Sequence, residues 1–520
     1  HDRPQYVFMR EAVAIYMGSG ENEISNIKSC YELLSGMRAT HATPTMSNAC
    51  TESQQLGSCF LLQSPDSIEG IMSTLANCSR ISKYGGGVGI GMHNIRHRGS
   101  TIASTGGQSS GLPRQLKIYN EAARCWDQGG KRPGAFAIYV EPWHGDILDF
   151  LKLKLNQGSD TERARDLFYA LWIPDLYMKR IERDESWSLF SSNTAPGLCD
   201  VYDGMDVCTH CRYCANPNYA KYIELEGLSD GCQHEFIPVD AFTQLYTRYE
   251  EDGLAVGTLP AREILNAVCN MQRESGTPYV MFKDHVNRTS NQKNVDTIRS
   301  SNLCCEIMEV STPESYACCT LASVNLKMFV TDNGFDHEHL HSVVRHLTRN
   351  LDRIIDVNAY PVIECVANAV GYRQIGIGIQ ALADTFAMLR IPFVSAEAEK
   401  LDLEIAETIY HAAVTESAAL AQLYGSHVGF EGSPASHGIL HIDMWENTHA
   451  NIQSGLKLHT SGRYDWDAVR ELVKHGLRNA QLLAFMPTVS TSQVMGSNES
   501  FEPFDANIYT KATRAGKLTV

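Results

Sequence analysis

The amino-acid sequence predicts an α/β protein, because strand and helix patterns alternate over most of its 520 residues. A closed barrel fits this alternation, since large α/β barrels exceed the roughly 100–200 residues of a usual domain. The hydrophobic content of 43% and the charged content of 20% are typical of a globular protein with a large core. The chain has neither an internal repeat nor a low-complexity tract, but residues 204–238 interrupt the alternation and are interpreted as an insert.

Apolar spacing and turn residues predict the elements of the first part of the chain. Helices are expected where apolar side chains recur every three or four residues, and either Asp66 or Ser67 is expected to cap one of them. In chain order, the expected elements are a helical region over 5–39, a turn-rich stretch over 41–45, a strand over 56–62, a helix over 66–83, glycine-rich loops over 85–91 and 99–111 around a short strand, a strand over 135–140, and a helix followed by a second apolar segment within 160–182.

The longest predicted helix lies in the second half of the chain. It begins after Ser395, an N-cap residue, and ends near Tyr424, where Gly425 is a suitable residue to terminate a helix. Between these ends, apolar side chains such as Leu401 and Ile405 recur at helical spacing.

The charge balance excludes some partners. A formal net charge of −16 argues against a nucleic-acid coat and against an anionic membrane surface. A small anionic substrate remains compatible, because a few backbone N–H groups can bind a phosphate. The sequence shows no apolar run of about 18 residues and no signal peptide, so we expect a cytoplasmic protein. The 16 cysteines then indicate thiol or metal chemistry more than structural disulfides.

The segment from Ser301 to Ile307 is the most informative one. In an extended strand, Asn302, Cys304 and Glu306 share one face, because successive side chains alternate. Burying an amide, a thiol and a carboxylate together costs free energy, so such a set is typical of a functional site. A half-exposed edge strand is the alternative interpretation.

Two further segments carry cysteines among small and apolar residues, Leu56–Leu62 with Cys59 and Ala317–Ser323 with Cys318 and Cys319. With these motifs, the sequence resembles the catalytic large subunit of class I ribonucleotide reductase, of the eukaryote type also found in DNA viruses. The resemblance covers nearly the whole chain and also includes Arg3-Pro4-Gln5-Tyr6, Arg132-Pro133-Gly134-Ala135-Phe136, Glu141-Pro142-Trp143-His144, Ala164-Arg165-Asp166-Leu167-Phe168, Met486-Pro487-Thr488 and Asn498-Glu499-Ser500.

This resemblance implies a fold and a set of catalytic roles. Residues 1–520 are expected to form one catalytic body, a ten-stranded α/β barrel with flanking helices. Cys304 would be the transient thiyl radical that takes the 3′ hydrogen of the ribose. Glu306 would be the base for the 3′ hydroxyl, and Asn302 would orient the same region. Cys59 and Cys319 would be the reducing pair, which becomes a disulfide, while Cys305 and Cys318 would be wall residues.

The resemblance also implies a substrate site for ribonucleoside diphosphates. Its residues would be Thr43, Ser58, Asn302, Glu306 and a backbone nest for the phosphates at Thr488, Val489, Ser490 and Thr491. A plain polar turn is the alternative for the last segment. The glycine run at 85–91 fails the G-x-G-x-x-G pattern in every register, so a dinucleotide fold is disfavoured and a loop close to substrate is expected.

A second nucleotide site is implied for deoxynucleoside triphosphate effectors, across a homodimer. The matching residues are Asp66, Ser67, Ile68, Lys83, Arg96, Ala103 and Ser104. The loop that would convey effector identity matches residues 127–132. It is one residue shorter than the usual loop, so the family's specificity rules are not transferred.

The resemblance implies no cofactor within the active site. A metal-containing small subunit would supply the radical, a thioredoxin- or glutaredoxin-type protein would supply reducing equivalents, and ATP would be a further effector. The family's N-terminal ATP cone and C-terminal redox tail would lie before His1 and after Val520. The alternative function is a catalytically incompetent homologue that serves as a structural or interaction protein.

The insert at 204–238 carries a separate hypothesis. Cys208, Cys211 and Cys214 are followed about twenty residues later by Cys232 and His234, a spacing that suits a structural Zn²⁺. An unmetallated surface loop and an iron–sulfur site are the alternatives.

Overall fold

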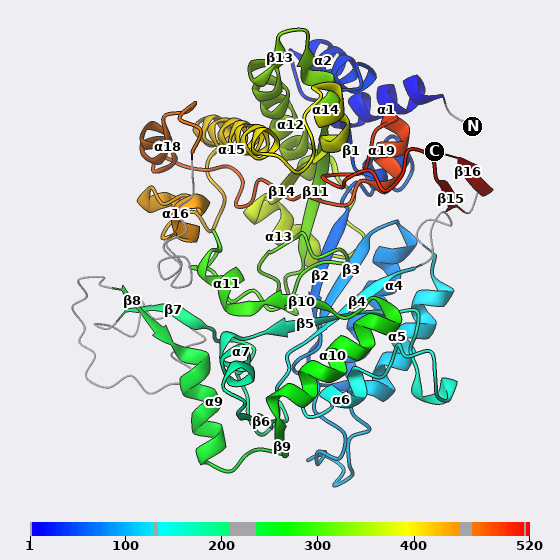
Figure 1. Ribbon diagram of the computed structural model, residues 1–520, viewed down its shortest axis with the longest axis vertical. Helices are drawn as coiled ribbons and strands as arrows, with labels where there is room; N and C mark the ends of the chain where they lie inside the picture. The colour runs from blue at the N-terminus through cyan, green and yellow to red at the C-terminus, as the bar shows by residue number, and fades with distance from the viewer. Residues whose placement is uncertain (1–2, 128–133, 209–235, 447–459, 514–515, 520) are drawn as a thin grey trace.

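Five parallel strands, β2, β3, β4, β5 and β10, lie side by side in that order at the centre of the molecule (Figure 1). The computed structural model describes residues 3–127, 134–208, 236–446, 460–513 and 516–519. The strands are β1 (Ala39–His41), β2 (Cys59–Gln63), β3 (Gly87–Gly91), β4 (Phe136–Val140), β5 (Phe168–Ile173), β6 (Ser186–Leu189), β7 (Asp203–Cys208), β8 (Phe236–Asp240), β9 (Gly257–Pro260), β10 (Tyr279–Phe282), β11 (Ala317–Asn325), β12 (Val330–Thr331), β13 (Gly334–Phe335), β14 (Ile375–Gln380), β15 (Thr510–Thr513) and β16 (Gly516–Thr519).

Helices surround this sheet. They are α1 (Pro4–Tyr16), α2 (Glu23–Ser35), α3 (Thr43–Asn48), α4 (Ile68–Lys83), α5 (Leu112–Cys125), α6 (Ile147–Phe150), η1 (Asp160–Glu162), α7 (Asp175–Glu182), α9 (Ala241–Glu251), α10 (Ala261–Ser275), α11 (Lys283–Arg288), η2 (Leu326–Phe329), α12 (His337–Val357), α13 (Glu364–Tyr372), α14 (Leu382–Met388), α15 (Ala396–Tyr424), η3 (Ala435–His437), α16 (His441–Glu446), α18 (Trp466–Val473) and α19 (Val489–Met495).

Strand β11 joins the parallel strands to the rest of the sheet. Its first residues pair antiparallel with β2, and its later residues pair parallel with β14 and antiparallel with β1. Every residue of β2, β4, β11 and β14 is buried, as expected for strands covered on both faces. The α/β prediction is therefore confirmed. Within the described ranges this main sheet has eight strands, where the resemblance implied a barrel of ten.

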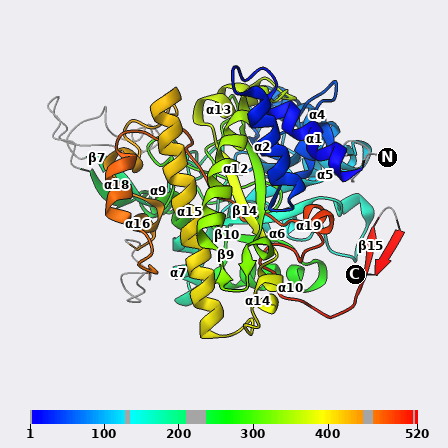
Figure 2. The ribbon, with the colours of Figure 1, turned by 90° about the horizontal axis from the view of Figure 1, so that it is seen from above.

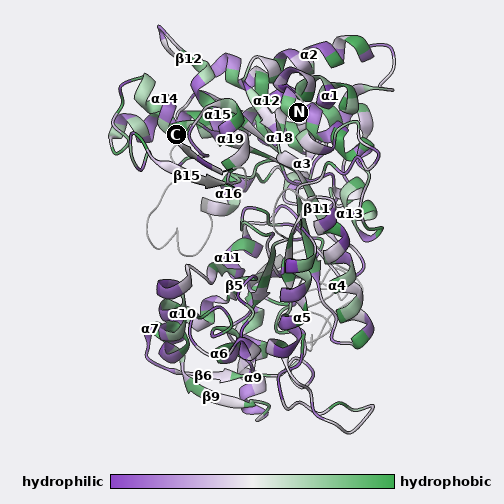
Figure 3. Ribbon diagram, turned by 90° about the vertical axis from the view of Figure 1, so that its right-hand side faces the viewer, coloured by the Kyte–Doolittle hydropathy of each residue, from purple (hydrophilic) through white to green (hydrophobic). Residues whose placement is uncertain are grey.

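The flanking helices follow from their sequence patterns. In α5, buried residues such as Leu112, Leu116 and Tyr119 recur at helical spacing, and Figure 3 shows both hydrophobic and hydrophilic residues on α4 and α5. The two long helices α12 and α15 run side by side (Figure 2). As predicted, α15 follows Ser395, whose side chain accepts a hydrogen bond from the N–H of Ala398.

The structure corrects several predicted elements. The stretch at 41–45, expected as a turn, holds the end of β1 and the start of α3. The helical region at 5–39 is two helices, because residues 17–22 turn the chain between α1 and α2. The glycine run at 85–91 contains strand β3 rather than only a loop. Within 160–182, the order is strand β5 and then helix α7, because the six residues Phe168–Ile173 are a buried run too short for a helix.

The predicted insert begins and ends in a β-hairpin. Strands β7 and β8 pair antiparallel, from Asp203 opposite Asp240 to Cys208 opposite Phe236. Cys211, Cys214, Cys232 and His234 lie outside the described residues. In the described part of the chain, no cluster of three metal-ligating side chains is present. No described helix combines the length and apolar character that a membrane span needs.

Candidate active site

Residues 301–307 form an irregular loop rather than the predicted strand. The side chain of Asn302 accepts a hydrogen bond from the backbone N–H of Ile307 (3.2 Å), and the Ser301 hydroxyl donates to the carbonyl of Ile307 (2.7 Å). Cys305 has a φ of 70°, in the left-handed region. These contacts close the loop on itself, so the extended conformation was the wrong prediction. Asn302, Cys304 and Glu306 nevertheless line one cavity, together with Leu303, which the alternation had put on the opposite face.

Strand β3 supports this loop through its glycines. A Cβ atom at Gly89 would lie 2.0 Å from the carbonyl oxygen of Ser301, and one at Gly87 would lie 3.3 Å from the side chain of Leu303. Gly87 and Gly89 are two residues apart and therefore lie on the same face of β3. Because neither has a side chain, the loop backbone can approach the strand closely. From β4, the hydroxyl of Tyr139 donates to the carbonyl of Asn302 (2.6 Å). The glycine run is thus a packing surface for the loop.

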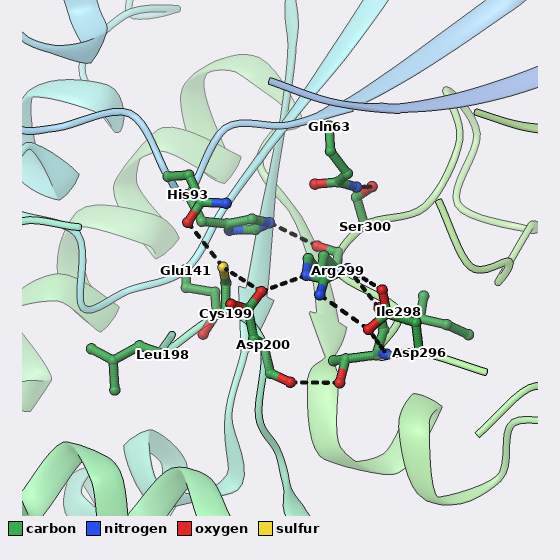
Figure 4. Close-up of polar contacts among 12 residues, drawn as sticks. Gln63, His93, Glu141, Leu198, Cys199, Asp200, Asp296, Ile298, Arg299 and Ser300 are labelled. Atoms are coloured by element: carbon green, nitrogen blue, oxygen red, sulfur yellow. Dashed lines mark hydrogen bonds and ion pairs between the residues drawn. The ribbon is translucent and has the colours of Figure 1, made fainter. Parts of the chain in front are cut away.

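The residues before the loop are fixed by a buried polar cluster, shown in Figure 4. The guanidinium of Arg299 donates to Asp200 (2.7 Å) and to Asp296 (3.1 Å). The imidazole of His93 donates from Nε2 to the carbonyl of Arg299 (2.7 Å), and burial lowers the pKa of His93 to about 3. Gln63 donates to the hydroxyl of Ser300 (2.8 Å). These contacts hold both the side chain and the backbone of the segment that leads into the loop.

Two thiols meet at the loop from opposite strands. Cys59 on β2 and Cys319 on β11 are direct cross-strand partners, and both are unbridged thiols. Directly opposed residues have Cα atoms about 4.5–5.5 Å apart, which lies within the range of about 4.4–6.8 Å found in disulfides. The fold therefore places these thiols where a disulfide could form.

The loop also contacts Cys59 directly. The Sγ atom of Cys59 accepts a hydrogen bond from the side chain of Asn302 (3.1 Å) and donates one to Oε1 of Glu306 (3.5 Å). Burial raises the pKa of Cys59 and of Cys319 well above the usual value, so both are neutral thiols near neutral pH. Burial also raises the pKa of Glu306.

The neighbouring cysteines occupy different surroundings. Cys304 is exposed to the cavity, whereas Cys305 contacts the hydroxyl of Tyr139 (3.3 Å). Cys318 belongs to the main hydrophobic core, while Cys59 and Cys319 belong to a smaller apolar cluster at the loop. The wall positions expected for Cys305 and Cys318 agree with this arrangement.

The cavity has a volume of about 730 Å³, which suits a ligand the size of a nucleotide. It is lined by all the residues expected to contact substrate, which are Thr43, Ser58, Asn302, Glu306, Thr488, Val489, Ser490 and Thr491. The segment expected as a nest or polar turn is the start of helix α19, with Thr488 as its N-cap residue. The cavity lining thus combines hydroxyls and backbone N–H groups with the thiol and carboxylate of the loop.

The residues expected at the effector site do not all lie together. Ser67 caps α4 and Ile68 is exposed at its first turn, while Arg96 donates to Asp66 (2.7 Å) and to the carbonyl of Thr101 (3.2 Å). Ala103 and Ser104 are exposed in the turn that follows Thr101. Lys83 lies at the opposite end of α4 and lines the large cavity. Of the loop at 127–132, only Asp127 is among the described residues.

Glu309 was not predicted as a site residue. The residue is 2% exposed, its Oε2 has no hydrogen-bond partner among the described residues, and burial raises the pKa of its carboxyl group to about 8. The sequence did hold a signal, because Glu309 is a carboxylate within an otherwise apolar run after Glu306.

The sequence was compared with models of known protein families. Residues 57–520 match the family model described as "Ribonucleotide reductase, barrel domain". The chain belongs to the ribonucleotide reductase large-subunit family. Residues 1–54 match the model described as "Ribonucleotide reductase, all-alpha domain". The resemblance inferred from the sequence motifs is confirmed.

Several ribonucleotide reductase large chains are similar over the whole of this chain. It is 45% identical to the ribonucleoside-diphosphate reductase large chain of Schizosaccharomyces pombe, 44% identical to that of Neurospora crassa and 44% identical to the large subunit of Danio rerio. Each match covers 100% of this chain, but only 58%, 51% and 59% of those relatives, respectively. The chain therefore spans little more than half of their length.

Proposed function

We propose that this chain is the catalytic body of a ribonucleoside-diphosphate reductase, which converts ribonucleoside diphosphates into deoxyribonucleoside diphosphates. The observation that carries the proposal is the meeting of Asn302, Cys304 and Glu306 with Cys59 in one cavity, with Cys319 directly opposite Cys59. Nothing in the described part of the chain supports the alternative of an incompetent scaffold, which has no physical need for this buried polar cluster.

In the proposed reaction, the sulfur of Cys304 is a thiyl radical that takes the 3′ hydrogen atom of the ribose. Glu306 accepts the proton of the 3′ hydroxyl, for which its Oε2 is suited because this atom has no hydrogen-bond partner among the described residues. The side chain of Asn302 hydrogen-bonds both to Ile307 and to Cys59, and these bonds hold the loop next to the reducing thiol.

The 2′ hydroxyl then leaves as water, and Cys59 and Cys319 supply the two electrons and two hydrogens of the reduction. They become a disulfide, and Cys304 regains its radical when it returns the hydrogen atom to the 3′ carbon. The substrate phosphates would bind at Thr488–Thr491, a hydroxyl-rich segment that lines the cavity.

Other components of the reaction are proposed from the family resemblance. They are a metal-containing small subunit that generates the radical, a thioredoxin- or glutaredoxin-type reductant, ATP and deoxynucleoside triphosphate effectors, and a homodimer in the cytoplasm. Asp66, Ser67, Ile68 and Arg96 support an effector site, because Arg96 binds Asp66 beside the N-terminus of α4 and also the carbonyl of Thr101, two residues before Ala103.

A structural Zn²⁺ in the insert remains a separate proposal. Cys208 ends strand β7 and pairs with Phe236 of β8, which supports the proposal because Cys232 and His234 precede Phe236 by only four and two residues in the sequence. Zinc binding contributes on the order of 10 kcal/mol to folding a short polar segment. Elemental analysis of the purified protein is expected to find stoichiometric zinc, and its absence or a brown chromophore would disprove the proposal.

A cysteine substitution tests the proposed activity. Cys304→Ser is expected to abolish deoxynucleotide formation, assayed with a radical-generating small subunit and a dithiol, and to leave substrate binding nearly unchanged. Cys269→Ser, at an exposed cysteine of α10, is the matched control and is expected to keep wild-type turnover. Turnover of even a few per cent in Cys304→Ser contradicts the radical assignment.

A further inference from the structure

A buried glutamine amide at the end of β14 connects three hydroxyl groups around the substrate cavity. Gln380 is 0% exposed and does not line the cavity itself. Its Nε2 donates to the hydroxyl of Ser323 on β11 (3.2 Å) and to that of Thr40 on β1 (3.4 Å). Its Oε1 accepts from the hydroxyl of Ser497 (3.2 Å). Both ends of the amide are therefore used, and they fix side chains from three separate parts of the chain.

Ser323 brings the first of these contacts to the cavity. It lines the cavity and is 2% exposed, so its hydroxyl has little freedom to move. The Ser323 oxygen accepts from Gln380 and lies 3.2 Å from the hydroxyl oxygen of Thr40. Because an amide N–H already points at this oxygen, the hydroxyl hydrogen of Ser323 must point elsewhere, towards Thr40 or into the cavity. Gln380 thus sets the orientation of a polar group in the cavity wall.

Ser497 connects Gln380 to the phosphate segment, Thr488–Thr491. The backbone N–H of Ser497 donates to the carbonyl of Ser492 (2.9 Å), and the Ser492 hydroxyl lies 2.5 Å from the hydroxyl of Thr488. Three residues after Ser497, the N–H of Ser500 donates to the Thr488 hydroxyl (2.8 Å). The chain after α19 therefore folds back onto the phosphate segment, and the buried amide holds the first residue of this return.

The backbone next to Gln380 holds the same part of the chain. The N–H of Ala381 donates to the carbonyl of Asn498 (3.1 Å), and the carboxylate of Asp384 accepts from the N–H of Asn498 (2.8 Å). Ala381 (φ 70°) and Ser500 (φ 42°) both have the left-handed conformation, which is uncommon for residues other than glycine. Such a conformation persists only where surrounding contacts impose it, and it is concentrated at functional sites.

We propose that Gln380 is a positioning residue for the diphosphate of the substrate, an inference that rests on the proposed phosphate site at Thr488–Thr491. Gln380 acts through its partners: it orients Ser323 in the cavity wall, and through Ser497 it holds the phosphate segment in place relative to that wall. It takes no part in bond making or breaking. Its loss is therefore expected to weaken the binding of the phosphates more than it slows the chemical step.

The test compares the binding of CDP with that of cytidine, which has the same base and ribose but no phosphate. Dissociation constants are measured by equilibrium dialysis, without radical or turnover. Gln380→Met keeps the length of the side chain but loses its donor and its acceptor. It is expected to weaken CDP binding by about tenfold, which corresponds to the loss of about one hydrogen bond to the substrate, and to leave cytidine binding nearly unchanged. In turnover assays, KM for CDP is expected to rise while kcat changes less.

A second buried glutamine provides the matched control. Gln374, directly before β14, is also 0% exposed, but its amide donates to Gln292 (3.4 Å) and not to the return of the chain after α19. Gln374→Met is therefore expected to affect stability without changing the ratio of CDP to cytidine affinity.

Two variants at Ser497 keep the proposal testable if Gln380→Met does not fold. Ser497→Ala removes the same hydrogen bond from the other side and is expected to weaken CDP binding selectively, whereas Ser497→Thr keeps the hydroxyl and is expected to restore it. Equal losses of CDP and cytidine binding in Gln380→Met, or wild-type CDP binding in Ser497→Ala, overturn the role of Gln380 alone. If the wild type binds CDP no more tightly than cytidine, the proposed phosphate site is wrong as well.

Discussion

Gly89 lies so close to Ser301 that a Cβ atom at position 89 would be 2.0 Å from the carbonyl oxygen of Ser301. This contact joins the first third of the chain to the loop that carries Cys304. The loop has no ladder of hydrogen bonds to a strand, so its position depends on this close approach and on the contact between Tyr139 and Asn302. The glycine is therefore as much a part of the site as the polar residues are.

Gly89→Ala is expected to displace the loop and to reduce turnover at least tenfold. The added methyl group overlaps backbone atoms that cannot move without shifting the loop, and such overpacking destabilises a protein by about 1–3 kcal/mol. Urea unfolding and steady-state turnover measure the two effects. The matched control is Gly257→Ala in β9, where the nearest atom lies 4.0 Å from the added Cβ. Equal turnover in both variants would show that the loop does not depend on Gly89.

A single turnover without external reductant is expected to link Cys59 to Cys319 and not to Cys318. Successive side chains of a strand alternate faces, and the sulfur of Cys318 lies 2.8 Å from where a Cβ of Gly57 would be, within the main core. Peptide mapping by mass spectrometry identifies the pair. Cys318→Ser serves as the control and should form the same link, whereas a peptide containing linked Cys318 would refute the assignment.

Arg299→Met is expected to destabilise the protein by about 3–5 kcal/mol, because it leaves the carboxylates of Asp200 and Asp296 without their buried partner. If the fold survives, turnover should fall more than substrate affinity, since Arg299 positions the loop and does not line the cavity. Denaturation curves and a comparison of kcat with KM provide the measurement. Arg262→Met breaks an exposed ion pair with Asp184 and is expected to change stability by less than about 1 kcal/mol.

Acidification is expected to destabilise the protein partly through His93. Its pKa falls from 6.5 to about 3 on folding because burial disfavours the charged imidazole, so the folded state binds fewer protons between these values. The stability is therefore complete above about pH 6.5 and is lost as the pH falls, by roughly 2 kcal/mol between about pH 7 and pH 5.

His93→Gln isolates this contribution from that of the other histidines. The variant keeps a side-chain N–H donor for Arg299 but cannot titrate, so its urea midpoint should change less with pH than that of the wild type. Identical pH dependence in the two proteins would show that His93 does not contribute.

Local signals in the sequence predicted the helix ends well. Ser67 and Ser395 each cap a helix as expected, because a cap depends on residues three positions apart. The resemblance placed the polar residues of the loop in one site, but the extended backbone conformation predicted for them was wrong. The hydrogen bond between the side chain of Asn302 and the N–H of Ile307 folds the loop back, and the alternation of polar and apolar residues does not indicate such a contact. The glycine run was misread for a similar reason: glycine is typical of loops, and its partner Ser301 lies more than 200 residues away.

The position of Cys319 opposite Cys59 has a consequence for the folding stability of the molecule as well. A disulfide between them would close a loop of about 260 residues, for which the chain-entropy treatment gives roughly 5–6 kcal/mol of stabilisation at 25 °C. Each catalytic cycle would then alternate between a cross-linked chain that resists global unfolding and an open chain that unfolds more readily. The redox state of the site could then be measured by limited proteolysis, because the reduced protein would be cleaved faster than the oxidised protein.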